Sequence, residues 1–449
     1  MNIKFFLNVS FAFCVLIAIG FENAFLNVLL IDISIIYFYI SFMPKYVFHP
    51  NNIIFAFSFL YVVLPSSIQL FYDYFEIPYL LPWGALYDWF SYEQNTYYSV
   101  FLIFIVFYFS FYIFNQNDVA PVKVIYRVNL SFLFFLLVFT VFMLMVYLQL
   151  TGGVVRWVVS YKEAFLLGRS GYGFINFFIL FLVNLLVFFL GLYFYGEKGS
   201  AKRTVLIISL FLIIFASLLQ GLKSRVIILL IIFFFPYLLK LRLNGFKLLL
   251  LGSLFFVVLF VGNYIRSDGY YNSFSFFIEY MMTYFNVYDL HNMIVTRSEP
   301  SIFDTVHHIF VKPALALGIL PQGSDFDISV MLTKKYFPSD WNEMKATQQW
   351  PLVTELYYNY YSFLFGWFPL LVYSYFLSSL YKKVKRGRIA LSLIFILEFF
   401  RLFTVQRGVL IPWQMPVYLF YYLIIYIVTI YVVEVKPIEA SSRENEKNI

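Results

Sequence analysis

Apolar runs of about 20 residues follow one another along most of this chain, and they constrain its fold more than any other feature. A helix of this length is what the hydrocarbon core of a bilayer requires. Only 12% of the 449 residues are charged, whereas a soluble domain carries about 25%. We therefore expect an all-α polytopic membrane protein that forms a single membrane domain.

Twelve runs are long enough to cross a bilayer. They lie near residues 3–20, 24–43, 52–72, 97–115, 131–151, 174–195, 203–220, 225–243, 247–265, 356–380, 389–406 and 410–433. This pattern predicts spans 1–9 within residues 1–265, a large loop at 266–355, spans 10–12 within 356–433, and a polar tail at 434–449. The loop contains prolines and short amphipathic stretches such as 274–290, which indicate helices lying on or dipping into the membrane face.

Basic residues are distributed unevenly between the predicted loops. If the N-terminus is inside, every short even-numbered connection is basic, and the strongest cluster is KKVKRGR at residues 382–388. Because cytoplasmic loops are enriched in lysine and arginine, this pattern predicts both termini in the cytoplasm and the 266–355 loop on the external side. It also explains the net charge of +7 without a nucleic-acid partner.

Three arginines depart from this rule because they fall at predicted external helix ends. Arg225 follows the turn GLKSR, Arg266 ends span 9 in GNYIRSDGYY, and Arg407 lies in VQRGVLIPW. At a common depth, their guanidinium groups would suit a phosphate or pyrophosphate, which they can bind in a bidentate manner. Alternatively, each could reach lipid phosphates or pair with a carboxylate. Lys223 is a weaker candidate of the same kind, since it would serve equally well as a surface anchor.

Glu355 stands where the large loop returns to the membrane, among several tyrosines. It could act as a general base or hold an acceptor hydroxyl, while Tyr357, and Tyr270 at the other end of the loop, could stack on sugars. The alternative for Glu355 is a salt bridge to one of the arginines.

Glu398 and Arg401 lie three residues apart in span 11 and therefore on one helix face. A structural ion pair is the simplest interpretation, but ionisable groups inside a membrane are functional candidates, so Arg401 is also a candidate for substrate binding. The adjacent His307 and His308 would point about 100° apart on a helix and are poorly placed to share a metal. We expect neither a metal nor a cofactor.

The layout, with GLKSR opening a span, NYIRSDGYY starting the large loop, TELYYNYYSFLFGWFP ending it and RG in VQRGVLIP, resembles the Wzy-type polymerases of O-antigen and related surface polysaccharides. The resemblance implies a GT-C-like membrane glycosyltransferase of the bacterial inner membrane that joins undecaprenyl-pyrophosphate-linked repeat units, as donor and acceptor, on the periplasmic face, so that the 266–355 loop is periplasmic. It implies that Arg225, Arg266 and Arg407 bind the donor pyrophosphate, with Arg225 and Arg266 assisting catalysis, and that Glu355 orients or deprotonates the acceptor hydroxyl. A Wzz-type regulator of chain length would be a partner.

Two other functions would need similar cationic contacts. A flippase or other transporter of lipid-linked oligosaccharides would usually place them along a central cavity between related halves. An O-antigen ligase would share the donor chemistry and is poorly separated from a polymerase by sequence alone.

Overall fold

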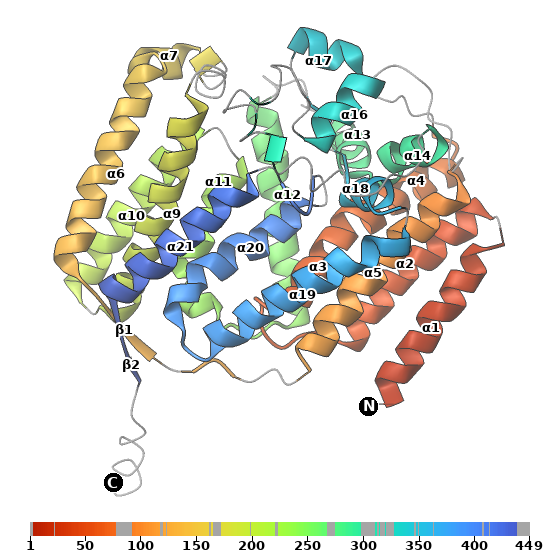
Figure 1. Cartoon of the computed structure of the whole chain (residues 1–449), viewed down its shortest axis with the longest axis horizontal. Coiled ribbons are helices and arrows are strands. Elements are labelled where there is room, and N and C mark those ends of the chain that lie inside the picture. The colour runs from red at the N-terminus through yellow and green to blue at the C-terminus, as the bar shows by residue number, and fades with distance from the viewer. Residues whose placement is uncertain are drawn as a thin grey trace, which may run out of the picture. The chain divides into compact units, whose positions relative to one another are not determined.

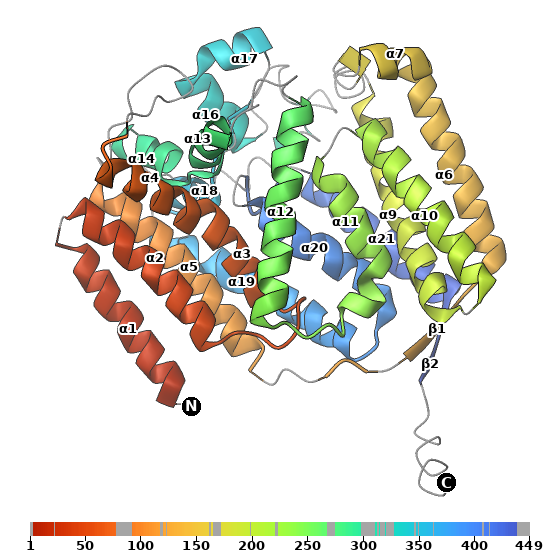
Figure 2. The same ribbon diagram turned by 180° about the vertical axis from the view of Figure 1, so that it is seen from behind.

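The structure of the chain is a computed structural model (Figures 1 and 2). It describes residues 3–21, 23–77, 92–116, 120–122, 124–160, 163–164, 172–197, 199–220, 223–266, 274–297, 310–311, 314, 319, 327–344, 347–348, 350–361, 363–405, 408–412 and 414–437.

Each of the twelve apolar runs contains a helix. In the described residues, eight helical segments are long and apolar enough to cross a membrane: α2 (Ala24–Ser41), the continuous segment Pro50–Tyr74, α5 (Gln94–Phe114), α6 (Leu130–Leu150), α9 (Gly173–Gly196), α10 (Ser200–Gln220), α19 (Phe363–Lys385) and α21 (Met415–Val432). The other runs form α1 (Ile3–Ile19), α11 (Lys223–Leu238), α12 (Gly245–Arg266) and α20 (Ser392–Val405). The chain is therefore a mostly helical protein with eight candidate membrane spans, and the total of twelve stays a prediction.

The chain divides into two compact units, and the single membrane domain stays a prediction. Unit 1 consists of Met1–Asn117, Gly245–Ser379 and Glu398–Leu419, and unit 2 of Asp118–Asn244, Leu380–Leu397 and Phe420–Ile449. Each unit is discontinuous because the chain leaves it and returns. The described part of the predicted periplasmic loop belongs to unit 1.

Unit 1 is built from the first spans and the helices of the large loop. Helices α1, α2 and α5 pack against one another (Figures 1 and 2). The loop helices are α13 (Phe274–Phe285), α14 (Tyr288–Arg297), α16 (Ile328–Tyr336), α17 (Pro338–Met344) and α18 (Leu352–Asn359). Helix α14 packs against both α5 and α18. The amphipathic stretch predicted at 274–290 is thus helical, with a break between α13 and α14.

The third predicted span contains a short π-helix. It runs as α3 (Pro50–Ser58), η1 (Phe59–Val63) and α4 (Leu64–Tyr74). Pro65 has no N–H to donate to the carbonyl of Tyr61, which would be its partner in a regular α-helix. That carbonyl instead accepts the N–H of Val287, at the corner between α13 and α14, at 3.3 Å. The large loop is therefore hydrogen-bonded to this span through a backbone carbonyl that Pro65 does not use.

Unit 2 is centred on α9, which packs against α6, α10 and α11 (Figure 2). A β-carbon at Gly191 of α9 would lie 2.2 Å from the carbonyl oxygen of Phe233 in α11. These two helices approach so closely because Gly191 has no side chain. The short α7 (Gly153–Val159) follows α6.

Unit 2 also contains a two-stranded antiparallel ribbon. Strand β1 (Val124–Val128) pairs with β2 (Val433–Pro437), with Tyr126 opposite Val435. Beside it, the N–H of Val122 donates to the carbonyl of Lys385 at 2.9 Å. The segment predicted as a polar tail from residue 434 thus begins as a strand.

Two predicted span boundaries are wrong. The sequence predicts that span 10 begins at residue 356, but α18 ends at Asn359 and α19 begins at Phe363; between them Tyr361 has a positive φ of 52°, which a helix cannot accommodate. It also predicts that span 12 begins at residue 410, but α21 begins at Met415. Pro412 lacks an N–H, and Pro416 fits the first turn of α21, where no N–H is required.

Candidate functional site

Glu355 lies in the first turn of α18, in unit 1, and is only 1% exposed. Its carboxylate Oε2 accepts the backbone N–H of Leu410 at 2.5 Å. A carboxylate in the first turn is also favoured by the helix dipole. Glu355 is therefore held in one orientation by a backbone group, rather than standing at the mouth of a long span as the sequence suggested.

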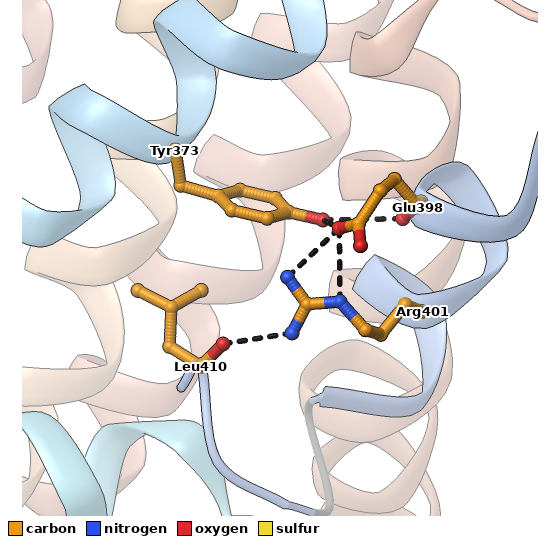
Figure 3. A network of polar contacts seen from close by, with 4 residues as sticks. All are labelled: Tyr373, Glu398, Arg401 and Leu410. Atoms are coloured by element: carbon orange, nitrogen blue, oxygen red, sulfur yellow. Dashed lines mark hydrogen bonds and ion pairs between the residues drawn. The ribbon is translucent and has the colours of Figure 1, made fainter. Parts of the chain in front are cut away.

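The same residue, Leu410, is held from its other side by Arg401. The Nη1 group of Arg401 donates to the carbonyl oxygen of Leu410 at 2.7 Å. Figure 3 shows this bond together with the ion pair between Arg401 and Glu398, whose Oε2 lies 2.8 Å from Nη2 and 2.9 Å from Nε. Charged hydrogen bonds of this kind are stronger than neutral ones. Glu355 and Arg401 thus hold the backbone of Leu410, in the short non-helical segment 408–412, from both sides.

Tyr373 of α19 completes this network (Figure 3). Its hydroxyl lies 2.9 Å from Oε2 and 3.1 Å from the carbonyl oxygen of Glu398. The Arg401 guanidinium lies 5.1 Å from the centre of the Tyr373 ring, within the range of a cation–π interaction. The ion pair predicted for Glu398 and Arg401 is confirmed, and substrate binding by Arg401 stays a prediction.

A histidine that the sequence analysis did not select lies beside α18. His291 of α14 is fully buried; its Nδ1 lies 3.4 Å from the hydroxyl of Thr354, and its ring meets Tyr357 edge-on at 5.5 Å. Burial lowers the pKa of His291 to about 3, so the ring is neutral at physiological pH. Burial also raises the pKa of Tyr357. A single histidine in a polar loop gives no sequence signal, which is why it was missed.

Arg225 forms a separate buried polar site in unit 2. Its side chain is 4% exposed and donates to Gln220 Oε1 at 2.8 Å, to Asn184 Oδ1 at 2.7 Å and to the carbonyl of Leu180 at 3.2 Å. All of these acceptors are neutral. No carboxylate of the described residues contacts this guanidinium, although a buried cation is strongly stabilised by an opposite charge. The arrangement therefore suits an anionic ligand.

The remaining predicted residues are described only in part or not at all. Lys223 begins α11 and Arg266 ends α12, but their side chains lie outside the described atoms. Tyr270 and Arg407, with His307 and His308, lie outside the described residues. The common depth of the three arginines therefore stays a prediction, and the structure joins Glu355 with Arg401 through Leu410.

Comparison of the chain with known protein families, with curated proteins and with solved structures finds no match.

Proposed function

We propose that the chain is a metal-independent membrane glycosyltransferase that polymerises undecaprenyl-pyrophosphate-linked oligosaccharide repeat units. The observation that carries the proposal is the buried Arg225 guanidinium, whose described partners are three neutral oxygens. A lipid pyrophosphate is an anionic group that would compensate such a charge in a bilayer protein. Arginine suits this role because its planar fork binds phosphate oxygens in pairs.

The proposed reaction assigns one role to each residue. An acceptor hydroxyl attacks the anomeric carbon of the donor sugar, a new glycosidic C–O bond forms, and the bond from that carbon to the pyrophosphate oxygen breaks. The bonding electrons leave with the lipid pyrophosphate, and Arg225 stabilises its negative charge. The hydroxyl proton passes to a carboxylate, and Glu355, whose orientation is fixed by its bond to Leu410, is the candidate that the family resemblance assigns to this step.

The test compares matched pairs of variants at equal membrane levels. Arg225→Gln is paired with Arg203→Gln, an exposed arginine of α10 in the same unit, and Glu355→Gln with Glu343→Gln, an exposed glutamate of α17. Surface glycans are separated on a gel. We expect the Arg225 and Glu355 variants to lose long polymer and to retain lipopolysaccharide capped with a single repeat, while both controls keep the polymer ladder.

The other outcomes distinguish the rival functions. Loss of every capped species would favour a flippase or a ligase, because both act on the material that becomes the single-repeat cap. A full polymer ladder in both Arg225→Gln and Glu355→Gln would overturn the proposal. Partial activity in Arg225→Lys would support a charge requirement rather than a packing requirement.

A further inference from the structure

Unit 1 contains a cavity where α2 and α5 begin. Its volume is about 310 Å³, and it is lined by Ala24, Asn27, Tyr92, Glu93, Gln94 and Tyr97. This volume lies at the lower end of the range of about 300–1,000 Å³ for ligand sites. The lining is mostly polar, with two tyrosine rings in contact at 5.9 Å and an angle of 67°.

Two carboxamides on this lining have unmet hydrogen-bonding capacity. Asn27 is 1% exposed, and its amide donates only a long bond of 3.5 Å to Gln94 Oε1. Among the described residues, neither Asn27 Oδ1 nor Gln94 Nε2 has a partner. Exchanging the oxygen and nitrogen of both amides would leave the same deficit, because one contact joins the two side chains. Buried polar atoms are normally paired, so these two indicate a ligand that supplies both a donor and an acceptor.

The charges at the cavity narrow the class of ligand. The carboxylate of Glu93 would repel an anionic ligand. A cation is also a poor match, because Glu93 is the one carboxylate in the described lining and the other polar side chains there are amides and tyrosine hydroxyls. The Glu93 side chain forms no cap on α5, so the N–H donors of the first turn of that helix are not used by it. A neutral molecule with many hydroxyl groups matches this mixture, because each hydroxyl both donates and accepts. Tyrosine rings provide the apolar faces on which a sugar ring packs.

The wall of the cavity continues into α14. The ring of Tyr92 stacks on Tyr288 at 5.4 Å, and its hydroxyl donates to Asp289 at 2.6 Å. The N–H of Glu93 donates to Asn292 at 2.8 Å. On the same helix His291 contacts Thr354, the neighbour of Glu355. One short helix thus connects the cavity wall with the helix that holds Glu355.

We propose that this cavity binds one neutral pyranose ring of a glycan and is a subsite for the substrate. The inference rests on the proposed function, since it names the part of the lipid-linked repeat unit that unit 1 recognises. Asn27 and Gln94 contribute hydrogen bonds to sugar hydroxyls, and Tyr92 and Tyr97 contact the ring.

The test measures glycan binding to the full chain in nanodiscs by saturation-transfer NMR. The probe is the lipid-free repeat-unit oligosaccharide released from the surface polysaccharide of the native cells. Ala24→Phe fills the cavity, and its control is Phe25→Leu, an exposed neighbour on α2. We expect the wild type and Phe25→Leu to bind the probe, and Ala24→Phe to lose the signal.

A second pair keeps the test valid if Ala24→Phe does not fold. Gln94→Ala removes one amide from the lining, and Asn95→Ala changes the exposed neighbour. Loss of one good hydrogen bond predicts about tenfold weaker binding for Gln94→Ala alone. Absence of binding to the wild type, or equal binding by Gln94→Ala and Asn95→Ala, would overturn the subsite.

The two proposals fail in distinguishable ways. Probe binding that depends on the cavity, together with polymer ladders that persist in Arg225→Gln and Glu355→Gln, would keep the subsite and reject the polymerase. Polymer loss in Arg225→Gln and Glu355→Gln, together with probe binding that the cavity variants do not change, would keep the polymerase and reject the subsite.

Discussion

At the scale of single residues, the ion pair between Glu398 and Arg401 matters because it is buried. Glu398 is fully buried and the Arg401 side chain is 12% exposed. Replacing one member of such a pair leaves the other charge without compensation, which costs about 3–5 kcal/mol. Removing both charges costs far less.

Arg401→Met should therefore lower the free energy of unfolding by about 3–5 kcal/mol, and adding Glu398→Gln should restore much of it. The measurement is reversible unfolding in mixed detergent micelles followed by circular dichroism. Arg386→Met, an exposed arginine beyond α19, is the control and should change little. Equal losses in the single and double variants would contradict the prediction.

The buried His291 predicts a dependence of stability on pH. Its pKa is about 3 in the folded protein and has an ordinary value of 6.5, so between these values the unfolded chain binds the proton and the folded chain does not. Stability contributed by neutral His291 is thus complete above pH 6.5 and is lost as pH falls towards 3, by at most about 1.4 kcal/mol per pH unit.

The measurement is the unfolding midpoint between pH 7.5 and 5 for the wild type and for His291→Gln. The difference between the two curves isolates the histidine from the carboxylates, and we expect the variant to have the shallower dependence. Parallel curves would contradict the assignment.

Residue-level predictions from sequence succeeded where a charge interrupts an apolar run. Glu398 and Arg401 were selected for that reason, and the structure pairs them; Arg225 was selected instead as a cation at a predicted external helix end, and the structure buries it. Asp32 of α2, which is bonded to Ser66 at 2.7 Å, carried the same signal and was overlooked. The sequence could not indicate that Leu410 links Glu355 with Arg401, because both bonds use its backbone atoms.

At the scale of elements, the close contact between α9 and α11 depends on Gly191. A β-carbon there would overlap the Phe233 carbonyl, so Gly191→Ala should destabilise unit 2 by about 1–3 kcal/mol. Gly252→Ala in α12 is the control, because a β-carbon at that glycine would have no neighbouring atom within 4 Å; higher helix propensity should make it neutral or stabilising. Thermal unfolding in detergent would compare them, and similar melting temperatures would contradict the prediction.

Apolar length predicted where the helices of this chain lie, but it could not predict their interruptions. The break at Tyr361 depends on one backbone angle. The strands β1 and β2 are short and lie about 300 residues apart in the sequence. Burial alternates along β1 in the structure, but neither strand was predicted from the sequence, because pairing over such a distance leaves no local pattern.

At the scale of the whole molecule, the ribbon constrains how often the chain crosses the bilayer. Bonded segments must lie on the same side, so the end of α19 at Lys385, the Val122 segment and β2 share one side. Between Lys385 and β2 lies the candidate span α21. An even number of crossings then requires that α20 also crosses, although it has only 14 residues.

Cysteine labelling tests this topology in a Cys14→Ser background, where the chain has no other cysteine. Arg127→Cys in β1 and Arg386→Cys after α19 should react with a membrane-impermeant maleimide from the same side. Gly408→Cys, after α20, should react from the opposite side. Labelling of all three from one side would refute the crossing by α20.

The docking of Val287 onto the carbonyl of Tyr61 has a consequence for how this chain can change over evolutionary time. The bond uses only main-chain atoms and a vacancy left by Pro65. Substitutions at Val287 or Tyr61, other than proline at position 287, retain both bonding groups, so neighbouring side chains can drift without removing it. A chain that keeps this proline would therefore keep the contact between its large loop and this span, whatever side chains surround it.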